Sequence, residues 1–173
     1  FEGSMPMMGR KDIELEALKQ MSKPKDERRL NGLNLIKNKE KVAMWEDNMG
    51  NAIVTIRGTD HRDSGDIIDN FLNFGGSKEL KNTRRYLRAR EFINEKLDNI
   101  DQTGRGSLKV LGYSLGGATA TRLAQDYHFL PIKVYNPIIS NSQMQKDLFK
   151  KLKEFNSNIE FFFVDEDPIS VNL

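Results

Sequence analysis

The segment that most constrains this chain is a serine with a glycine two residues away on each side. Residues 112–116 have the sequence Gly-Tyr-Ser-Leu-Gly, after an apolar run at 108–111 and before small residues at 117–120. This order predicts a buried strand that turns sharply into a helix, with the serine at the turn. The glycines would let backbone segments approach closely. The hydroxyl is therefore expected at the carboxyl end of a strand, where helix amides could stabilise an oxyanion.

Short apolar runs alternate along the chain with longer segments whose apolar residues recur at helical spacing. Strands are predicted at 41–46, 52–57, 107–113, 132–135 and 158–164. Helices are predicted over an N-terminal segment that includes Ile13, Leu15, Leu18 and Met21, and at 26–36, 65–74, 77–100, 115–127 and 142–155. The pattern predicts an α/β domain with a mostly parallel central sheet, an N-terminal antiparallel hairpin and helices on both faces.

Length and charge limit the organisation of the chain and its partners. The 173 residues are expected to form one domain, 1–173, with residues 1–4 interpreted as a cloning remnant. Lysine and arginine total 27 against 25 acidic residues, which leaves a formal net charge of +2. This imbalance is too small for the strong field that a polyanion requires, so nucleic acid is not expected as a partner. The sequence does not indicate an oligomeric state.

Cysteine and histidine content argues against metal and thiol chemistry. The chain has no cysteine, and its two histidines, His61 and His128, are far apart in sequence. We therefore expect no disulfide, no metal site and no cofactor. No apolar run approaches the roughly 20 residues that span a bilayer, and the sequence does not start with a signal-peptide pattern. A soluble protein is expected, with the cytoplasm as its expected compartment.

Four segments together carry a family pattern. They are Ile56-Arg57-Gly58-Thr59, the Gly-Tyr-Ser-Leu-Gly-Gly run at 112–117, Tyr135-Asn136-Pro137, and the Val-Asp-Glu-Asp-Pro-Ile run at 164–169. In this order they resemble the oxyanion strand end, the nucleophile elbow and two later strand ends of the class 3 lipases, the fungal-type triacylglycerol lipases within the α/β-hydrolases. The resemblance spans residues 42–169 and implies an α/β-hydrolase fold. Tyr113 departs from the histidine that is usual at its position in the family.

The resemblance also implies roles for individual residues. Ser114 would be the nucleophile, in an elbow that includes Gly112 and Gly116. Thr59 and the backbone amide of Leu115 would form the oxyanion hole. Asp167 would be the acid that orients the base, with Asp165 as the competing choice and a solvated acidic loop as the plain alternative.

A lid is also implied, at residues 62–74, immediately after the oxyanion strand. Its apolar stripe could meet a lipid surface, and a stripe packed into the core explains the periodicity equally well. The family's tryptophan is absent from this segment, since the only tryptophan is Trp45.

The catalytic base is the missing element. In this fold the triad histidine follows the acid, and no histidine follows Asp167. His128 is separated from Ser114 by a mostly helical segment of roughly 20 Å, which excludes it. His61 follows Thr59 closely and could approach Ser114, although the order of the triad would then be unusual. Two alternatives stay open: a carboxy-terminal segment with the base is absent from the sequence, or the protein has no such base.

The helix predicted at 77–100 is rich in basic residues. We interpret them as a solvated face with acids to pair with, and attraction to anionic lipid headgroups is the alternative. The residues concerned are Lys78, Lys81, Arg84, Arg85, Arg88 and Arg90, with Glu91 and Glu95 as the acids.

Two functions remain from different classes. The first is a serine ester hydrolase of lipase or esterase type, which acts on an acyl ester or lipid through a Ser114 acyl-enzyme, needs no cofactor and touches lipid surfaces transiently. The second is a catalytically incomplete hydrolase-fold module that binds an acyl lipid or a protein partner. The absence of a histidine after Asp167 is what keeps the second function open.

Overall fold

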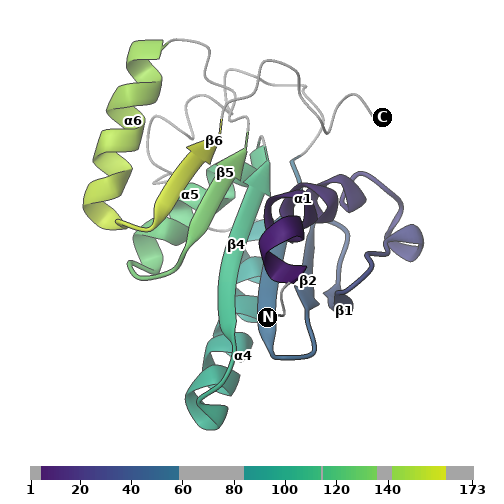
Figure 1. The fold of residues 1–173 in the computed structure, drawn as a ribbon. Helices are drawn as coiled ribbons and strands as arrows, with labels where there is room; N and C mark the ends of the chain where they lie inside the picture. Colours follow the sequence, from purple (N-terminus) through teal and green to yellow (C-terminus); the bar gives the residue numbers. More distant parts are fainter. Residues whose placement is uncertain (1–4, 59–83, 114, 136–141, 163–173) are drawn as a thin grey trace.

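The sheet has strand order β1-β2-β3-β4-β5-β6, the same as the order along the chain (Figure 1). The computed structural model describes residues 5–58, 84–113, 115–135 and 142–162. Within these ranges the strands are β1 (Asn34–Asn38), β2 (Val42–Glu46), β3 (Asn51–Ile56), β4 (Ser107–Tyr113), β5 (Ile132–Tyr135) and β6 (Ile159–Phe162). The helices are α1 (Met5–Gln20), α4 (Arg84–Thr103), α5 (Leu115–Asp126) and α6 (Ser142–Phe155). A short 3-10 turn, Lys25–Glu27, follows α1.

Strand direction divides the sheet into two parts. β1, β2 and β3 are antiparallel neighbours, whereas β3, β4, β5 and β6 run parallel. The predicted hairpin is therefore confirmed, and Gly50 supplies a φ of 87° in its turn. The predicted mostly parallel sheet with an antiparallel start is also confirmed.

The helix predicted at 26–36 is wrong. The chain forms only the 3-10 turn there before it becomes extended and enters β1, which pairs with β2. Gly32 has a φ of 87°, which an α-helix does not accommodate. Arg28 adds a second constraint, because its guanidinium binds backbone carbonyls of Lys23 and Lys39 and thus holds the chain in an open loop. The helix predicted at 65–74 and the first part of the one predicted at 77–100 lie outside the described residues.

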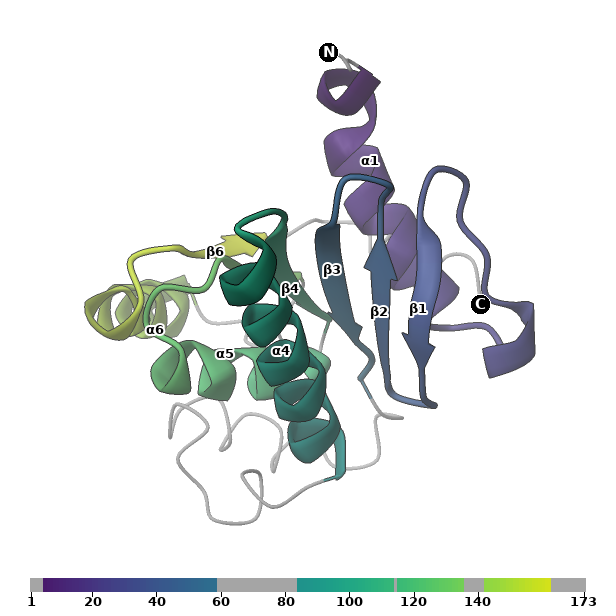
Figure 2. The ribbon, with the colours of Figure 1, turned by 90° about the horizontal axis from the view of Figure 1, so that it is seen from below.

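Alternate residues of the strands point to opposite faces, and each face is covered by helices (Figure 2). On one face, Val54, Val110 and Ile132 belong to a core that also includes residues of α4, α5 and α6. On the other face, Ile53, Leu111 and Trp45 lie in the two clusters that include residues of α1. Helices on both faces are therefore confirmed, and α1 alone among the described α-helices covers the second face.

A buried carboxylate docks α1 on the parallel part of the sheet. Glu14 of α1 is completely buried and accepts a hydrogen bond from Lys109 of β4 at 2.6 Å. Lys133 and the Tyr135 hydroxyl, both on β5, donate to it at 2.9 and 3.1 Å. Burial raises the pKa of Glu14, but the hydrogen bonds and charges of the two lysines outweigh it, and the net pKa lies below the ordinary 4.5. The charged form is the stable one in this site.

This arrangement predicts that low pH destabilises the folded protein through protonation of Glu14. Because the folded-state pKa lies below 4.5, the stabilisation is complete above that pH and is lost as the pH falls through the folded-state value. Glu14→Gln leaves two lysines without their shared counterion, so we expect a loss of about 3 kcal/mol at neutral pH. The acid dependence in this window should also flatten. Urea unfolding followed by circular dichroism at a series of pH values measures both effects.

Glu16→Gln is the matched control, since Glu16 is an exposed glutamate of the same helix, paired with Lys19 at 3.3 Å. That variant should keep the wild-type stability within about 0.5 kcal/mol. Equal behaviour of the two variants would contradict the docking role of Glu14.

Candidate active site

The carboxyl ends of the parallel strands meet at one edge of the sheet, to which the strand arrows point in Figure 1. Ile56 of β3 pairs with Gly112 of β4, and Tyr113 pairs with Tyr135 of β5. Tyr135 in turn pairs with Phe162 of β6. The residues that follow these strands therefore start next to one another. This edge is where ligands of open α/β sheets usually bind.

A single residue separates β4 from α5. β4 ends at Tyr113 and α5 begins at Leu115, so only Ser114 lies between them. A Cβ added to Gly112 would lie 2.5 Å from the carbonyl oxygen of Gly116 and 2.9 Å from the Ala120 Cβ. One bend therefore brings the end of the strand against the first turn of the helix, with no room for a side chain.

Gly116 makes the second close approach, toward the neighbouring strand. A Cβ at Gly116 would lie within 3.0 Å of the Ile56 carbonyl and of the carbonyl carbon of Arg57. Neither Gly112 nor Gly116 is among the glycines with positive φ, so glycine is needed there for its small volume. The start of α5 is thus pressed against the end of β3.

Most of the residues expected to carry the chemistry lie outside the described ranges. They are Ser114, Thr59, His61, Asp167 and its competitor Asp165, together with the expected lid at 62–74. Leu115 is described as the first residue of α5, which is where an oxyanion-stabilising amide is expected. The described part of the site is therefore its frame, namely the ends of β3, β4 and β5 and the start of α5.

The second histidine lies at the opposite edge of the sheet. His128 is exposed and follows the last residue of α5, Asp126, in the loop that leads into the start of β5. Since α5 begins at the carboxyl edge and ends near the amino edge, its full length separates His128 from the turn at 114. The exclusion of His128 as a base is consistent with this placement.

The basic residues of α4 do not form the uniformly solvated face that we expected. Arg88 does pair with Glu91, at 3.3 Å, but Glu95 pairs with Lys37 of β1, at 2.8 Å. Arg85 is buried, with 8% of its surface exposed, and its Nε has no hydrogen-bond partner. Helical periodicity could not reveal this, because it assigns charged residues to the solvent side by default.

The described residues offer neither a metal centre nor a membrane-spanning helix. Within residues 5–58, 84–113, 115–135 and 142–162, no group of three or more histidine, aspartate or glutamate side chains could hold a metal ion. Over the same part of the chain, no helix is both long and apolar enough to cross a bilayer.

Comparison with known families agrees with this geometry. The family model of the α/β hydrolase fold matches residues 67–172, which is more than half of the chain. The chain therefore belongs to the α/β hydrolase fold family. Among curated proteins, none matches the sequence. Membership supports a hydrolase in the broad sense and does not by itself select the bond that is cleaved.

The close approach at Gly116 predicts a steric cost for the smallest side chain. In Gly116→Ala the added methyl group meets the backbone of β3, which cannot rotate away, so we expect a loss of about 2 kcal/mol. Gly104→Ala is the control, because its surroundings are open and its cost comes only from a φ of 67°. That conformational cost is about 1 kcal/mol. Urea unfolding of the two variants compares them, and a Gly116→Ala protein as stable as wild type would contradict the packing described here.

Proposed function

We propose that this protein is a serine ester hydrolase of the lipase type, with Ser114 as its nucleophile. The observation that carries the proposal is the frame around that residue. One residue separates β4 from α5, two glycines that tolerate no side chain flank it, and the start of α5 is pressed against the end of β3. Such a strand-turn-helix arrangement is what a G-x-S-x-G nucleophile requires. The resemblance of residues 42–169 to class 3 lipases supports an acyl ester as the substrate.

The proposed reaction proceeds through a covalent acyl-enzyme. The Ser114 Oγ bonds to the ester carbonyl carbon while a base takes the hydroxyl proton. The base then gives this proton to the alcohol oxygen, and the alcohol leaves as its bond to the carbonyl carbon breaks. Water repeats the sequence on the acyl-enzyme and releases the carboxylic acid. The Leu115 amide and Thr59 would stabilise the negative oxygen in both halves of the reaction.

The acid and the lid complete the proposal. Asp167 would hold the base in its productive orientation, as the acid of a triad does. Residues 62–74 would cover the site as a lid whose apolar side chains contact a lipid surface.

His61 would be the base of this reaction. It is four residues beyond Arg57, which directly follows β3 and whose backbone Gly116 approaches closely. The segment that contains it therefore begins beside the nucleophile. His128, in contrast, lies at the opposite edge of the sheet.

An active-site probe tests the nucleophile directly. A fluorophosphonate should label the wild-type protein at one serine, and Ser114→Ala should abolish this labelling. Ser157→Ala, at an exposed serine between α6 and β6, should keep the wild-type labelling. Intact-mass spectrometry measures the adduct, and circular dichroism confirms that each variant is folded. A folded wild-type protein that takes up no probe would favour the alternative, a hydrolase-fold module that binds without catalysis.

The two histidines form a natural pair for testing the base. His61→Ala should lower the rate of ester hydrolysis and of labelling by at least about a hundredfold, since general-base catalysis contributes about that much. His128→Ala should leave both rates unchanged. Steady-state kinetics on a soluble acyl ester measures the effect. Equal rates in His61→Ala and wild type would remove His61 from the mechanism while leaving the role of Ser114 intact.

A further inference from the structure

The positive charge of Arg57, directly after β3, acts on two buried arginines, Arg28 and Arg85, and we refer to the three residues as the arginine cluster. Arg28 follows the 3-10 turn, Arg57 comes directly after β3, and Arg85 lies at the start of the described part of α4. Arg28 and Arg85 are buried, with 4% and 8% of their surfaces exposed, and Arg57 is half-buried. Within the described residues, no ion pair joins any of the three to a carboxylate.

Arg28 contributes charge to the cluster and no free donor. Its Nε donates to the Lys23 carbonyl, and its two terminal nitrogens donate to the Asn38 side chain and to three further backbone carbonyls. All of these acceptors are neutral groups. The guanidinium therefore serves the local fold, and the negative charge of Glu40 offsets burial and the charge of Arg57 only in part, because the pKa of Arg28 remains lowered.

Arg85 is a buried cation that pairs with no carboxylate among the described residues. Its Nε is buried without a hydrogen-bond partner. Burial and, to a smaller extent, the positive charge of Arg57 lower the pKa of Arg85 to about 10. A buried, unpaired charge is costly to a folded protein. Such a group is expected where a ligand supplies the missing negative charge.

Arg57 lies beside both a cavity and the frame of the candidate active site. Its positive charge also lowers the pKa of Arg28, an effect second to burial. Its side chain lines a cavity of about 420 Å³, which Lys23, Lys25 and Glu40 also line. Its backbone is one of the groups that Gly116 approaches closely. An anion in this cavity would thus lie beside the strand end that packs against α5.

We propose that the arginine cluster binds a phosphate group, and that the ester substrate carries this phosphate on its alcohol part. The reasons are the cavity beside Arg57, which Arg28 and two lysines also line against one described carboxylate, Glu40, and the buried Nε of Arg85 without a partner. Guanidinium forms charge-assisted, bidentate hydrogen bonds with phosphate oxygens, and these strengthen away from water. The identity of the substrate rests on the proposed function, whereas the binding of phosphate does not.

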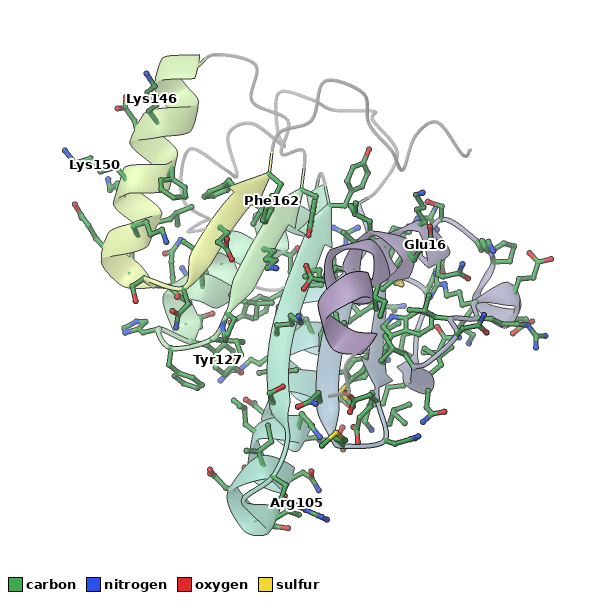
Figure 3. All side chains as sticks on the ribbon, in the orientation of Figure 1. Glu16, Arg105, Tyr127, Lys146, Lys150 and Phe162 are labelled. Atoms are coloured by element: carbon green, nitrogen blue, oxygen red, sulfur yellow. The ribbon has the colours of Figure 1, made fainter. Side chains whose placement is uncertain are left out.

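Phosphate binding can be tested without any catalysis. Inorganic phosphate should raise the Tm of the wild-type protein above its value in sodium chloride at equal ionic strength. Arg57→Gln should lose this difference. Arg105→Gln should keep it, because Arg105 is exposed and lies beyond the end of α4 opposite to the β-strand arrowheads (Figure 3). The same Tm in both salts for wild type, or an equal phosphate shift in all three proteins, would overturn the site.

The direction of the Tm change in an Arg85 variant distinguishes a ligand-binding role from a structural role. If Arg85 is an unpaired cation kept for a ligand, Arg85→Met should raise the Tm in phosphate-free buffer and reduce the shift that phosphate causes. A lower Tm in phosphate-free buffer with an unchanged phosphate shift would show that Arg85 supports the fold, and it would overturn its place in the site.

A matched pair of esters tests the source of the phosphate. With the same acyl chain, 1-acylglycerol-3-phosphate should be hydrolysed with a kcat/KM about tenfold above that of 1-acylglycerol, as one charged hydrogen bond would provide. The ratio should fall toward one in Arg57→Gln and stay high in Arg105→Gln. A phosphate-induced Tm shift without this preference would assign the site to free phosphate and overturn its assignment to the substrate. Hydrolysis of neither ester, with the Tm shift retained, would contradict the proposed function alone.

Discussion

The contact on which this structure depends is the one between the start of α5 and the end of β3. Gly116 lies so close to the Ile56 carbonyl that a methyl group would displace backbone, and Gly112 lies equally close to Gly116. These two approaches, together with the pairing of Ile56 with Gly112, set the position of the β4–α5 turn relative to the neighbouring strand. The segments that leave β3 and β4 therefore begin side by side. A site at this edge can draw one group from each segment, as a nucleophile and an oxyanion hole require.

Sequence patterns predicted the buried elements better than the exposed ones. β4, β5 and α6 have the predicted bounds, because their apolar residues are bounded by glycine, proline or polar turns. β1 was missed, since it is an edge strand whose side chains are exposed or half-buried. Leu30, Leu33 and Ile36 recur at three-residue spacing and imitate a helix face. In the structure Leu33 is partly buried against the core while Ile36 is 50% exposed, as a strand after a loop permits.

The candidate site divides in a similar way. The positions of Gly112 and Gly116 could be anticipated, because a sharp turn between strand and helix places a local demand on volume. The burial of Glu14 and Arg85 could not, because each is a charged residue of a helix, and periodicity places such residues in solvent. Their partners come from distant parts of the chain. Glu14 finds two lysines on β4 and β5, whereas Arg85 has another arginine as its charged neighbour. Only the three-dimensional structure distinguishes a neutralised buried charge from one that is not.

The position of the only tryptophan has a practical consequence. Trp45 is completely buried on the face that α1 covers, in one cluster with Ala17 and Met21, and its indole nitrogen donates to the Thr55 hydroxyl at 3.0 Å. Fluorescence of the intact chain therefore comes from a single, dry environment. A shift of its emission toward longer wavelength would report that α1 has lifted from the sheet. Trp45 is thus an intrinsic fluorescent reporter of the helix-covered face, and no added label is needed.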